Sequence, residues 1–300
     1  MHIPASMLHG QICPVTATIS VLGLSSAVYC GIKSKDKPTA ANFGAVSALI
    51  FAGQMMNFPI TNGTSGHLIG GVLAASLLGT PFAVVAIALV VAIQSLLFSD
   101  GGVAVLGANI LNMAIIGTGI GGLIRSKLIS HQNSTRGKIL ATAFAAWASV
   151  IVASFAVSVE LAINGQIGFL TVLTAMVGTH ALIGIGESLI TVACFLLIHA
   201  HGLTKSDNKA TFGLPLTAAA LVALVLSPFA SSMPDGLESI AQKYNLLHQS
   251  APDFVGIFSG YSFPLVNNHI LSTGFAGLAG VMVAFGVGWL ISRILRPLTV

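Results

Sequence analysis

Long apolar runs recur along the whole chain and are separated by short polar or glycine-rich segments. A run of about 18–20 apolar residues makes a helix that spans the hydrocarbon core of a bilayer, and lipid supplies no partner for an open sheet edge. The runs therefore predict an all-α integral membrane protein, a polytopic helical bundle. They cover residues 12–32, 40–57, 67–79, 81–98, 102–124, 139–162, 181–203, 212–232 and 269–292.

Two apolar stretches are too short for this simple pattern. Residues 67–79 rise about 20 Å as a helix, against a hydrocarbon core of about 30 Å. This span therefore begins below the membrane surface or forms a re-entrant hairpin with its neighbour. Residues 166–178 are a further apolar stretch, which we interpret as a short helix or re-entrant segment on the outer side. The number of crossings depends on both interpretations.

The composition agrees with a membrane location and argues against nucleic acid as a partner. Hydrophobic residues make up 55% of the chain and charged residues only 7%, and the mean hydropathy is +0.93. These are too few charges to cover a soluble globule of this size. The net charge of +4 comes from basic residues in short clusters between the apolar runs, a placement that orients helices in a membrane.

The basic residues also predict the orientation of the helices. If the N-terminus lies outside the cytoplasm, eleven of the twelve lysines and arginines fall in cytoplasmic loops and only Lys243 lies outside. Positive residues are favoured on the cytoplasmic side, and the opening MHIPASMLHG lacks a secretory signal pattern. We therefore expect an extracytoplasmic N-terminus in a multi-pass protein of the cell inner (plasma) membrane.

A polar segment around residues 204–211 predicts two parts of the chain. Residues 1–203 form a core of about seven spans, and residues 204–300 form a C-terminal two-helix hairpin. Between the two helices of the hairpin, a polar outer loop contains the motif PDGLE at Pro234–Glu238. Proline, aspartate and glycine in this order are also typical of an ordinary turn.

The first two residues carry the clearest metal-binding chemistry. The terminal amine of Met1, the amide nitrogen of His2 and the imidazole Nδ1 of His2 can close one five-membered and one six-membered chelate ring around a metal ion. Planar nitrogen ligation of this kind is favoured by Ni(II) and Cu(II), and low-spin Co(II) accepts it. The ordinary alternative is a frayed terminal histidine, and the residues alone leave both interpretations open.

A fourth nitrogen is available from His67, in the segment TNGTSGHLIGG. Gly63 and Gly66 permit a tight loop, and we expect Thr64 or Ser65 to cap a helix in which His67 occupies the first turn. There the helix dipole would keep the imidazole neutral and able to ligate a metal. The ordinary alternative is a helix cap or a contact with lipid headgroups.

Glu187 and His180 are ionisable residues in an apolar run. They are seven residues apart, so they share one face if the helix is continuous. An ionisable group at membrane depth usually lines a path or has a partner. A proton relay, a part of the metal's route and a structural hydrogen bond are all open, and we favour the structural hydrogen bond.

Four asparagines flank the predicted outer loops: Asn57, Asn62, Asn109 and Asn112. Their side chains could hold the N-terminal segment over a metal site, because polar groups outside the ligand shell orient the ligands. Ordinary helix capping and packing is the equally weighted alternative.

Four segments together carry a family resemblance: MHIP at residues 1–4, NFPITNGTSGHLIGG at 57–71, SLLFSDGGVAVLGANILNMAIIG at 95–117 and THALIGIGESLIT at 179–191. They resemble the CbiM/NikM family, the substrate-binding membrane subunits of energy-coupling-factor (ECF) transporters for cobalt and nickel. The resemblance covers roughly residues 1–203. It implies a metal site that is built from Met1, His2 and His67.

The resemblance also implies transport without enzymatic activity in this chain. Ni(II) or Co(II) would be the transported substrate and not a cofactor, and a transmembrane coupling subunit with cytoplasmic ATPase subunits would supply the energy. The sequence has no GxxxxGK[ST] pattern for binding ATP. The PDGLE motif resembles small accessory subunits of this family, here fused to the core. The alternative function is a self-sufficient, proton-coupled secondary metal transporter that uses Glu187 and His180.

Overall fold

The computed structural model describes residues 1–61, 63–165, 167–200, 212–247 and 254–295. These residues are mostly helical and contain one antiparallel pair of short strands, β1 (Phe58–Pro59) and β2 (Ser65–Gly66). The α-helices are α1 (Ile12–Lys33), α2 (Ala40–Gln54), α3 (Gly71–Leu78), α4 (Thr80–Ile93), α5 (Leu106–Asn109), α6 (Gly121–Ser130), α7 (Thr135–Ile163), α8 (Phe169–Ala200), α9 (Gly213–Leu221), α10 (Gly236–Lys243) and α11 (His269–Leu295). The π-helical segments are η1 (Gln94–Phe98), η2 (Ile110–Ile120) and η3 (Val222–Leu226), and the 3₁₀ turns are η4 (Ser227–Phe229) and η5 (Ser259–Tyr261).

Within the described residues, six helical segments are long and apolar enough to cross a membrane. They are α1, α4 together with η1, the continuous segment from α5 to α6, α7, α8 and α11. α2 and the segment from α9 to η4 are also apolar but shorter. The predicted fold class, an all-α polytopic membrane protein, is confirmed.

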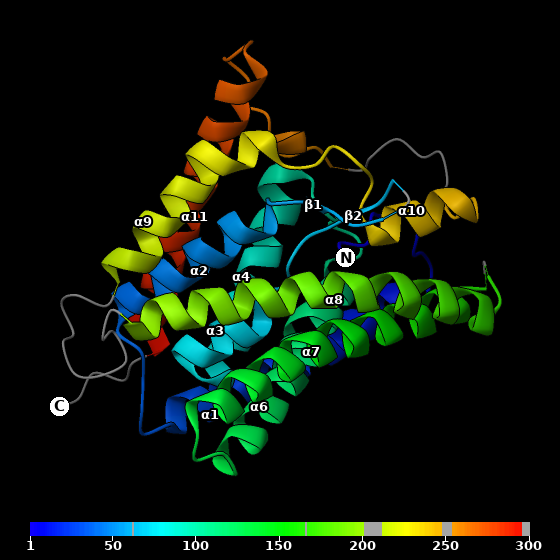
Figure 1. The fold of residues 1–300 in the computed structure, drawn as a ribbon. Coiled ribbons are helices and arrows are strands. Elements are labelled where there is room, and N and C mark those ends of the chain that lie inside the picture. Colours follow the sequence, from blue (N-terminus) through cyan, green and yellow to red (C-terminus); the bar gives the residue numbers. More distant parts are fainter. Residues whose placement is uncertain (62, 166, 201–211, 248–253, 296–300) are drawn as a thin grey trace.

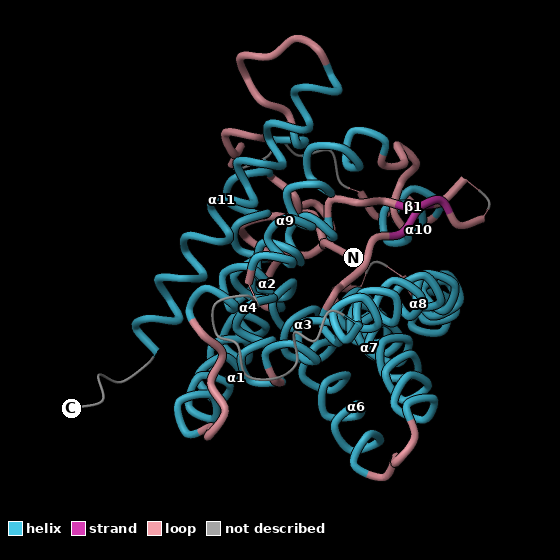
Figure 2. Tube along the Cα trace, turned by 60° about the vertical axis from the view of Figure 1, so that its left-hand side comes forward, coloured by secondary structure: helices cyan, strands magenta, loops and turns pink. Residues whose placement is uncertain are grey.

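The helices pack in a bundle in which α2 is central. α2 contacts α11, α9, α4 and α3, while α7 and α8 lie side by side (Figures 1 and 2). Most of α2 is therefore buried, including Phe43 and Phe51, as expected for a helix that is apolar on every side. In α1, by contrast, the buried residues are Thr16, Ser20 and Gly31, and apolar side chains face outward.

The predicted span at residues 67–79 is wrong at its start. α3 begins at Gly71, and His67 lies in the extended segment that follows β2. Gly70 has a left-handed backbone (φ 72°), a conformation that favours glycine and prevents a helix from continuing back through it. His67 is therefore outside the first turn of a helix, and the argument that a helix dipole keeps it neutral does not apply.

The interpretation of residues 166–178 as a separate short or re-entrant segment is also wrong. α8 begins at Phe169 and continues to Ala200, so this stretch is the first part of the same helix that contains Glu187. No proline interrupts α8, so nothing forces the predicted break. The last residues of the predicted span 181–203, and the expected boundary between residues 203 and 204, lie outside the described residues.

The C-terminal residues reach back to the beginning of the chain. α9, η3 and η4 pack against α11, and α11 packs against α2. Between them, the backbone at Pro234 joins the edge of β2, because Ser65 N donates to Pro234 O (2.9 Å) and Ser65 Oγ donates to Met233 O (2.7 Å). Ser65 is therefore bound to the PDGLE segment and does not cap a helix. Figure 1 shows α10 beside β2 and the N-terminus.

Candidate metal centre

The N-terminal segment is buried among the helices. Met1, His2 and Ile3 are 5%, 6% and 0% exposed. Asn109 holds this segment with two hydrogen bonds: Ile3 N donates to Asn109 Oδ1 (2.7 Å), and Asn109 Nδ2 donates to Ile3 O (3.1 Å). Gly102 N also donates to Ile3 O (3.1 Å). The segment therefore has a fixed position rather than a frayed one.

The four candidate asparagines differ in the groups that they contact. Asn109 holds the N-terminal segment as expected, whereas Asn112 Nδ2 donates to Glu160 Oε2 (2.7 Å) and so has a different role. Asn57 contributes its backbone oxygen, which accepts from Ser231 N (2.8 Å). Asn62 lies outside the described residues.

The loop that carries His67 is fixed by Glu187 of α8. Ile69 N donates to Glu187 Oε2 (2.7 Å) and Gly70 N donates to Glu187 Oε1 (2.9 Å), and Glu187 is fully buried. Both carboxylate oxygens are thus bound to the backbone just after His67. This is the structural hydrogen bond that we favoured, but its partners are backbone amides and not His180.

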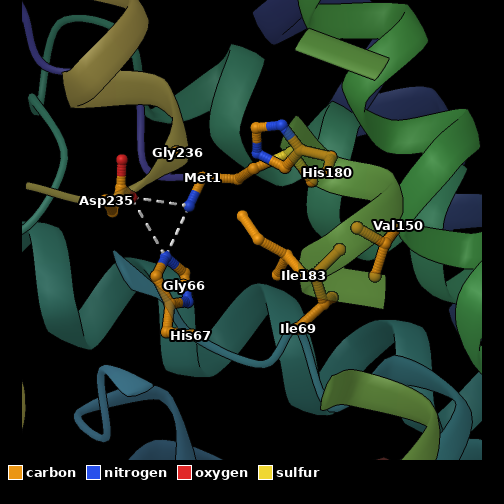
Figure 3. Close-up of a pocket in the computed structure, with 9 residues that line it drawn as sticks. All are labelled: Met1, Gly66, His67, Ile69, Val150, His180, Ile183, Asp235 and Gly236. Atoms are coloured by element: carbon orange, nitrogen blue, oxygen red, sulfur yellow. Dashed lines mark hydrogen bonds and ion pairs between the residues drawn. The ribbon is translucent and has the colours of Figure 1, made fainter. Parts of the chain in front are cut away.

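His180 lies beside the N-terminus and forms a hydrogen bond within its own helix. Its Nδ1 donates to Met176 O (2.8 Å) within α8. Its ring lines a cavity of about 10 Å³ together with Met1, His67 and Asp235 (Figure 3), close to the smallest volume that holds one water molecule. The two ionisable residues of α8 therefore have different surroundings.

The terminal amine meets His67 at the centre of the site. Met1 N contacts His67 Nε2, and Asp235 Oδ2 lies 3.0 Å from Met1 N and 3.4 Å from His67 Nε2. Figure 3 shows these three groups pointing toward one another. The imidazole of His67 also stacks on that of His2, with ring centroids 5.1 Å apart and an interplanar angle of 19°. The three predicted site residues, Met1, His2 and His67, are thus brought together.

The second imidazole has a defined tautomer. His2 Nε2 donates to Gln94 Oε1 (3.0 Å), and Gln94 Nε2 in turn donates to Tyr261 Oη (3.3 Å). In a neutral imidazole this leaves the lone pair on Nδ1, which lies 3.3 Å from Asp100 Oδ1. An unprotonated Nδ1 cannot donate a hydrogen bond to the Asp100 carboxylate. A cation bound between these two groups would therefore be favourable.

Burial and charge set the protonation of the site. Burial lowers the pKa of His2 to about 4, although Asp100 opposes this shift. Burial on its own would raise the pKa of Asp235, but the terminal amine and His67 outweigh it and hold that pKa well below its usual range. At neutral pH the site therefore contains a neutral His2 imidazole and an Asp235 carboxylate.

The donor set consists of nitrogens from the backbone and from two imidazoles. The described residues contain no cluster of three or more histidine, cysteine, aspartate or glutamate side chains with metal-binding spacing. The Met1 amine contacts the His67 imidazole, which stacks on that of His2, and all three residues are buried. Such nitrogens suit Ni(II), Co(II) and Cu(II) better than Mg²⁺ or Ca²⁺, which prefer oxygen.

Three polar residues of this site were not predicted from the sequence. Asp235, Asp100 and Gln94 contact Met1, His67 or His2, yet none was a candidate. Asp235 and Asp100 are each followed by glycine and lie on the same predicted outer side, and that shared location was the available signal. Gln94, next to Ser95, is a polar residue in an otherwise apolar run, and this was also an available signal.

Comparisons with known proteins agree with the fold and with the family resemblance. Residues 2–204 match the family described as cobalt uptake substrate-specific transmembrane region (CbiM), and residues 209–297 match the PDGLE domain. A crystal structure of a truncated transition metal transporter superimposes with a TM-score of 0.60 at 33% identity, over 67% of this chain and 99% of the other.

Several relatives are named as nickel or cobalt transport proteins. A protein of Archaeoglobus fulgidus, provisionally named a fused nickel transport protein (NikMN), is 31% identical over 99% of both chains. The fused nickel transport protein NikMN of Rhodobacter capsulatus is 30% identical over 55% of this chain and 48% of its own. The cobalt transport protein CbiM of Acetoanaerobium sticklandii is 31% identical over 52% of this chain and 65% of its own.

Proposed function

Because the chain belongs to the CbiM family of cobalt uptake substrate-specific transmembrane regions, we propose that it is the metal-binding subunit of a transporter for Ni(II) or Co(II). The observation that carries the proposal is the contact of the Met1 amine with His67 Nε2, beside the stacked imidazole of His2. The ion is the transported substrate, and the chain has no catalytic step of its own.

The proposed ligands are four nitrogens: the Met1 amine, the His2 amide, His2 Nδ1 and His67 Nε2. The first three belong to two consecutive residues, so covalent geometry keeps them together once the amide loses its proton. A planar set of this kind suits Ni(II), Cu(II) and low-spin Co(II) and disfavours Zn(II), which prefers a tetrahedron. The deprotonated amide adds a negative charge that offsets the charge of the ion.

We also propose the side of the membrane on which the metal binds and the partner subunits of the transporter. We infer that the site opens to the outer face, because eleven of twelve basic residues then lie on the cytoplasmic side. The sequence lacks a Walker A motif. The resemblance to the CbiM/NikM family implies import of the ECF type, driven by a transmembrane coupling subunit and cytoplasmic ATPases. In this scheme residues 1–203 bind the metal, and residues 204–300 act as a fused accessory part.

The experiment compares two histidine variants in cells that also contain the coupling and ATPase subunits. His67→Ala removes a proposed ligand, and His131→Ala removes an exposed histidine at the end of α6. We expect His67→Ala to lose nickel uptake and bound nickel in the purified chain, while His131→Ala keeps both. Stoichiometric nickel in purified His67→Ala would overturn the proposed site.

A further inference from the structure

One oxygen of the C-terminal part of the chain touches two proposed metal ligands. Asp235 Oδ2 lies 3.0 Å from Met1 N and 3.4 Å from His67 Nε2. The Asp235 residue is 7% exposed and belongs to the segment that matches the PDGLE domain. Met1 and Asp235 are far apart in sequence, so this contact depends entirely on how the C-terminal part packs on the core.

The two carboxylate oxygens of Asp235 have separate partners. Oδ1 caps α10, because Leu237 N and Glu238 N both donate to it (2.8 Å each), and Asp235 N donates back to Glu238 Oε2 (3.0 Å). The cap thus uses Oδ1 alone and leaves Oδ2 to face the site. An uncharged asparagine or serine caps a helix about as well as aspartate, so helix capping does not account for the charge.

The position of Asp235 relative to His67 is also fixed by the backbone. Ser65 N donates to Pro234 O (2.9 Å), and Ser65 forms a parallel bridge with Asp235. The strand residue Gly66 then leads directly to His67. Two short backbone connections therefore hold the carboxylate and the imidazole at a constant separation.

We propose that Asp235 is a positioning residue of the metal centre, through which the C-terminal part acts on metal binding. Its Oδ2 holds the terminal amine against His67, and its negative charge stabilises a divalent ion bound to both nitrogens from outside the ligand shell. This inference rests on the proposed four-nitrogen site. Loss of a partner of this kind typically costs about 10–100-fold in metal affinity.

The test measures Ni(II) affinity, the nickel absorption spectrum and the melting temperature of the purified full-length chain. Asp235→Asn keeps the cap and removes the charge, and Asp235→Ser does the same through a hydroxyl if the asparagine variant folds poorly. Glu238→Gln is the matched control, because it removes an exposed charge three residues away without contact to Met1 or His67. His67→Ala reports on the proposed site itself.

We expect Asp235→Asn to weaken nickel binding by about 10–100-fold, with an unchanged spectrum, and Glu238→Gln to stay within about twofold of the native chain. Affinity of Asp235→Asn within about twofold of native would overturn the inference, and so would an altered nickel spectrum, which would make Asp235 a direct ligand. If His67→Ala abolishes binding in the same series, the proposed function stands even when the inference fails.

Discussion

Two buried carboxylates reach the segment around His67, and they differ in what they bind. Glu187 comes from the middle of α8, and both of its oxygens accept from backbone amides at Ile69 and Gly70. Asp235 comes from the start of α10, and one of its oxygens contacts the Met1 amine and His67. Backbone amides cannot exchange partners without unfolding the loop, whereas an amine and an imidazole can bind a metal.

The comparison shows that depth in the membrane does not by itself identify a transport residue. Glu187 has the location expected of a proton carrier, yet its hydrogen bonds give it the task of shaping the His67 loop. Asp235 lies in a turn-like motif of a segment that is predicted to lie outside the membrane, yet it contacts the proposed ligands. The proton-coupled alternative, which relies on Glu187 and His180, thus has less support than a metal centre at the N-terminus.

The largest expected effect separates ligand chemistry from loop structure. His2→Ala removes one imidazole of the proposed set, so we expect nickel affinity to fall by more than the ~10–100-fold typical of groups outside the ligand shell. Glu187→Gln keeps the size of the side chain and is expected to bind nickel more tightly than His2→Ala does. Calorimetric titration of both purified variants gives the order. The reverse order would break the distinction between the two regions.

Glu187→Ala tests the structural half of the comparison through stability. The change leaves the amides of Ile69 and Gly70 without their acceptor in a buried site, at a cost of about 1–3 kcal/mol each. We expect a clear drop in the melting temperature in detergent. Asp36→Ala, at an exposed position far from the His67 loop in sequence, is the control and should change the melting temperature far less. Equal melting temperatures would show that the loop does not depend on Glu187.

A smaller effect is expected when the N-terminal segment is released from its support. Asn109→Ala removes two hydrogen bonds to Ile3, each contributing about 1 kcal/mol, while every proposed ligand remains. We predict that nickel affinity falls by about tenfold, with no change in the nickel absorption spectrum. Asn57→Ala, which keeps the backbone contact to Ser231, is a control that should retain native affinity. Native affinity in Asn109→Ala would contradict the role of Asn109.

The smallest expected effect is a dependence of stability on pH that arises from His2. Its pKa is about 4 in the folded chain, below the usual value of about 6.5. The unfolded chain therefore binds more protons, so the stability due to neutral His2 is present above pH ~6.5 and is lost as pH falls toward ~4.

Between pH ~7 and ~5.5 this linkage corresponds to about 1 kcal/mol. Chemical denaturation of the chain with a chelator present measures it, and His2→Asn, which does not titrate, should flatten that part of the profile. An identical slope in the variant would show that His2 is not the titrating group.

The sequence predicted the helices better than the connections between them. Apolar runs located α1, α4, α7 and α11 because their length and composition suffice to identify a membrane helix. The start of α3 and the continuity of α8 were missed. The start of α3 depends on the left-handed backbone of Gly70 and on Glu187, which lies over one hundred residues later in the chain. The continuity of α8 depends on the absence of any interruption between two apolar stretches.

The site was predicted in part for a similar reason. Met1 and His2 could be predicted because their chelate geometry is covalent. His67 could be predicted because it stands in a glycine-rich loop on the same predicted outer side, and the family resemblance implies the same residue. Asp235 could not, because its contact with Met1 joins opposite ends of the sequence and no local pattern encodes it. A contact of this kind depends on tertiary packing alone.

The most direct test of the central claim is a nickel titration of the purified chain with a free or a blocked terminal amine. We predict tight binding when Met1 carries a free amine. Acetylation of the amine, or residues added before Met1, should abolish that binding. The melting temperature of each form, measured with a chelator present, shows that both are folded. Equal nickel affinity in the two forms would contradict a metal centre built on the first residue.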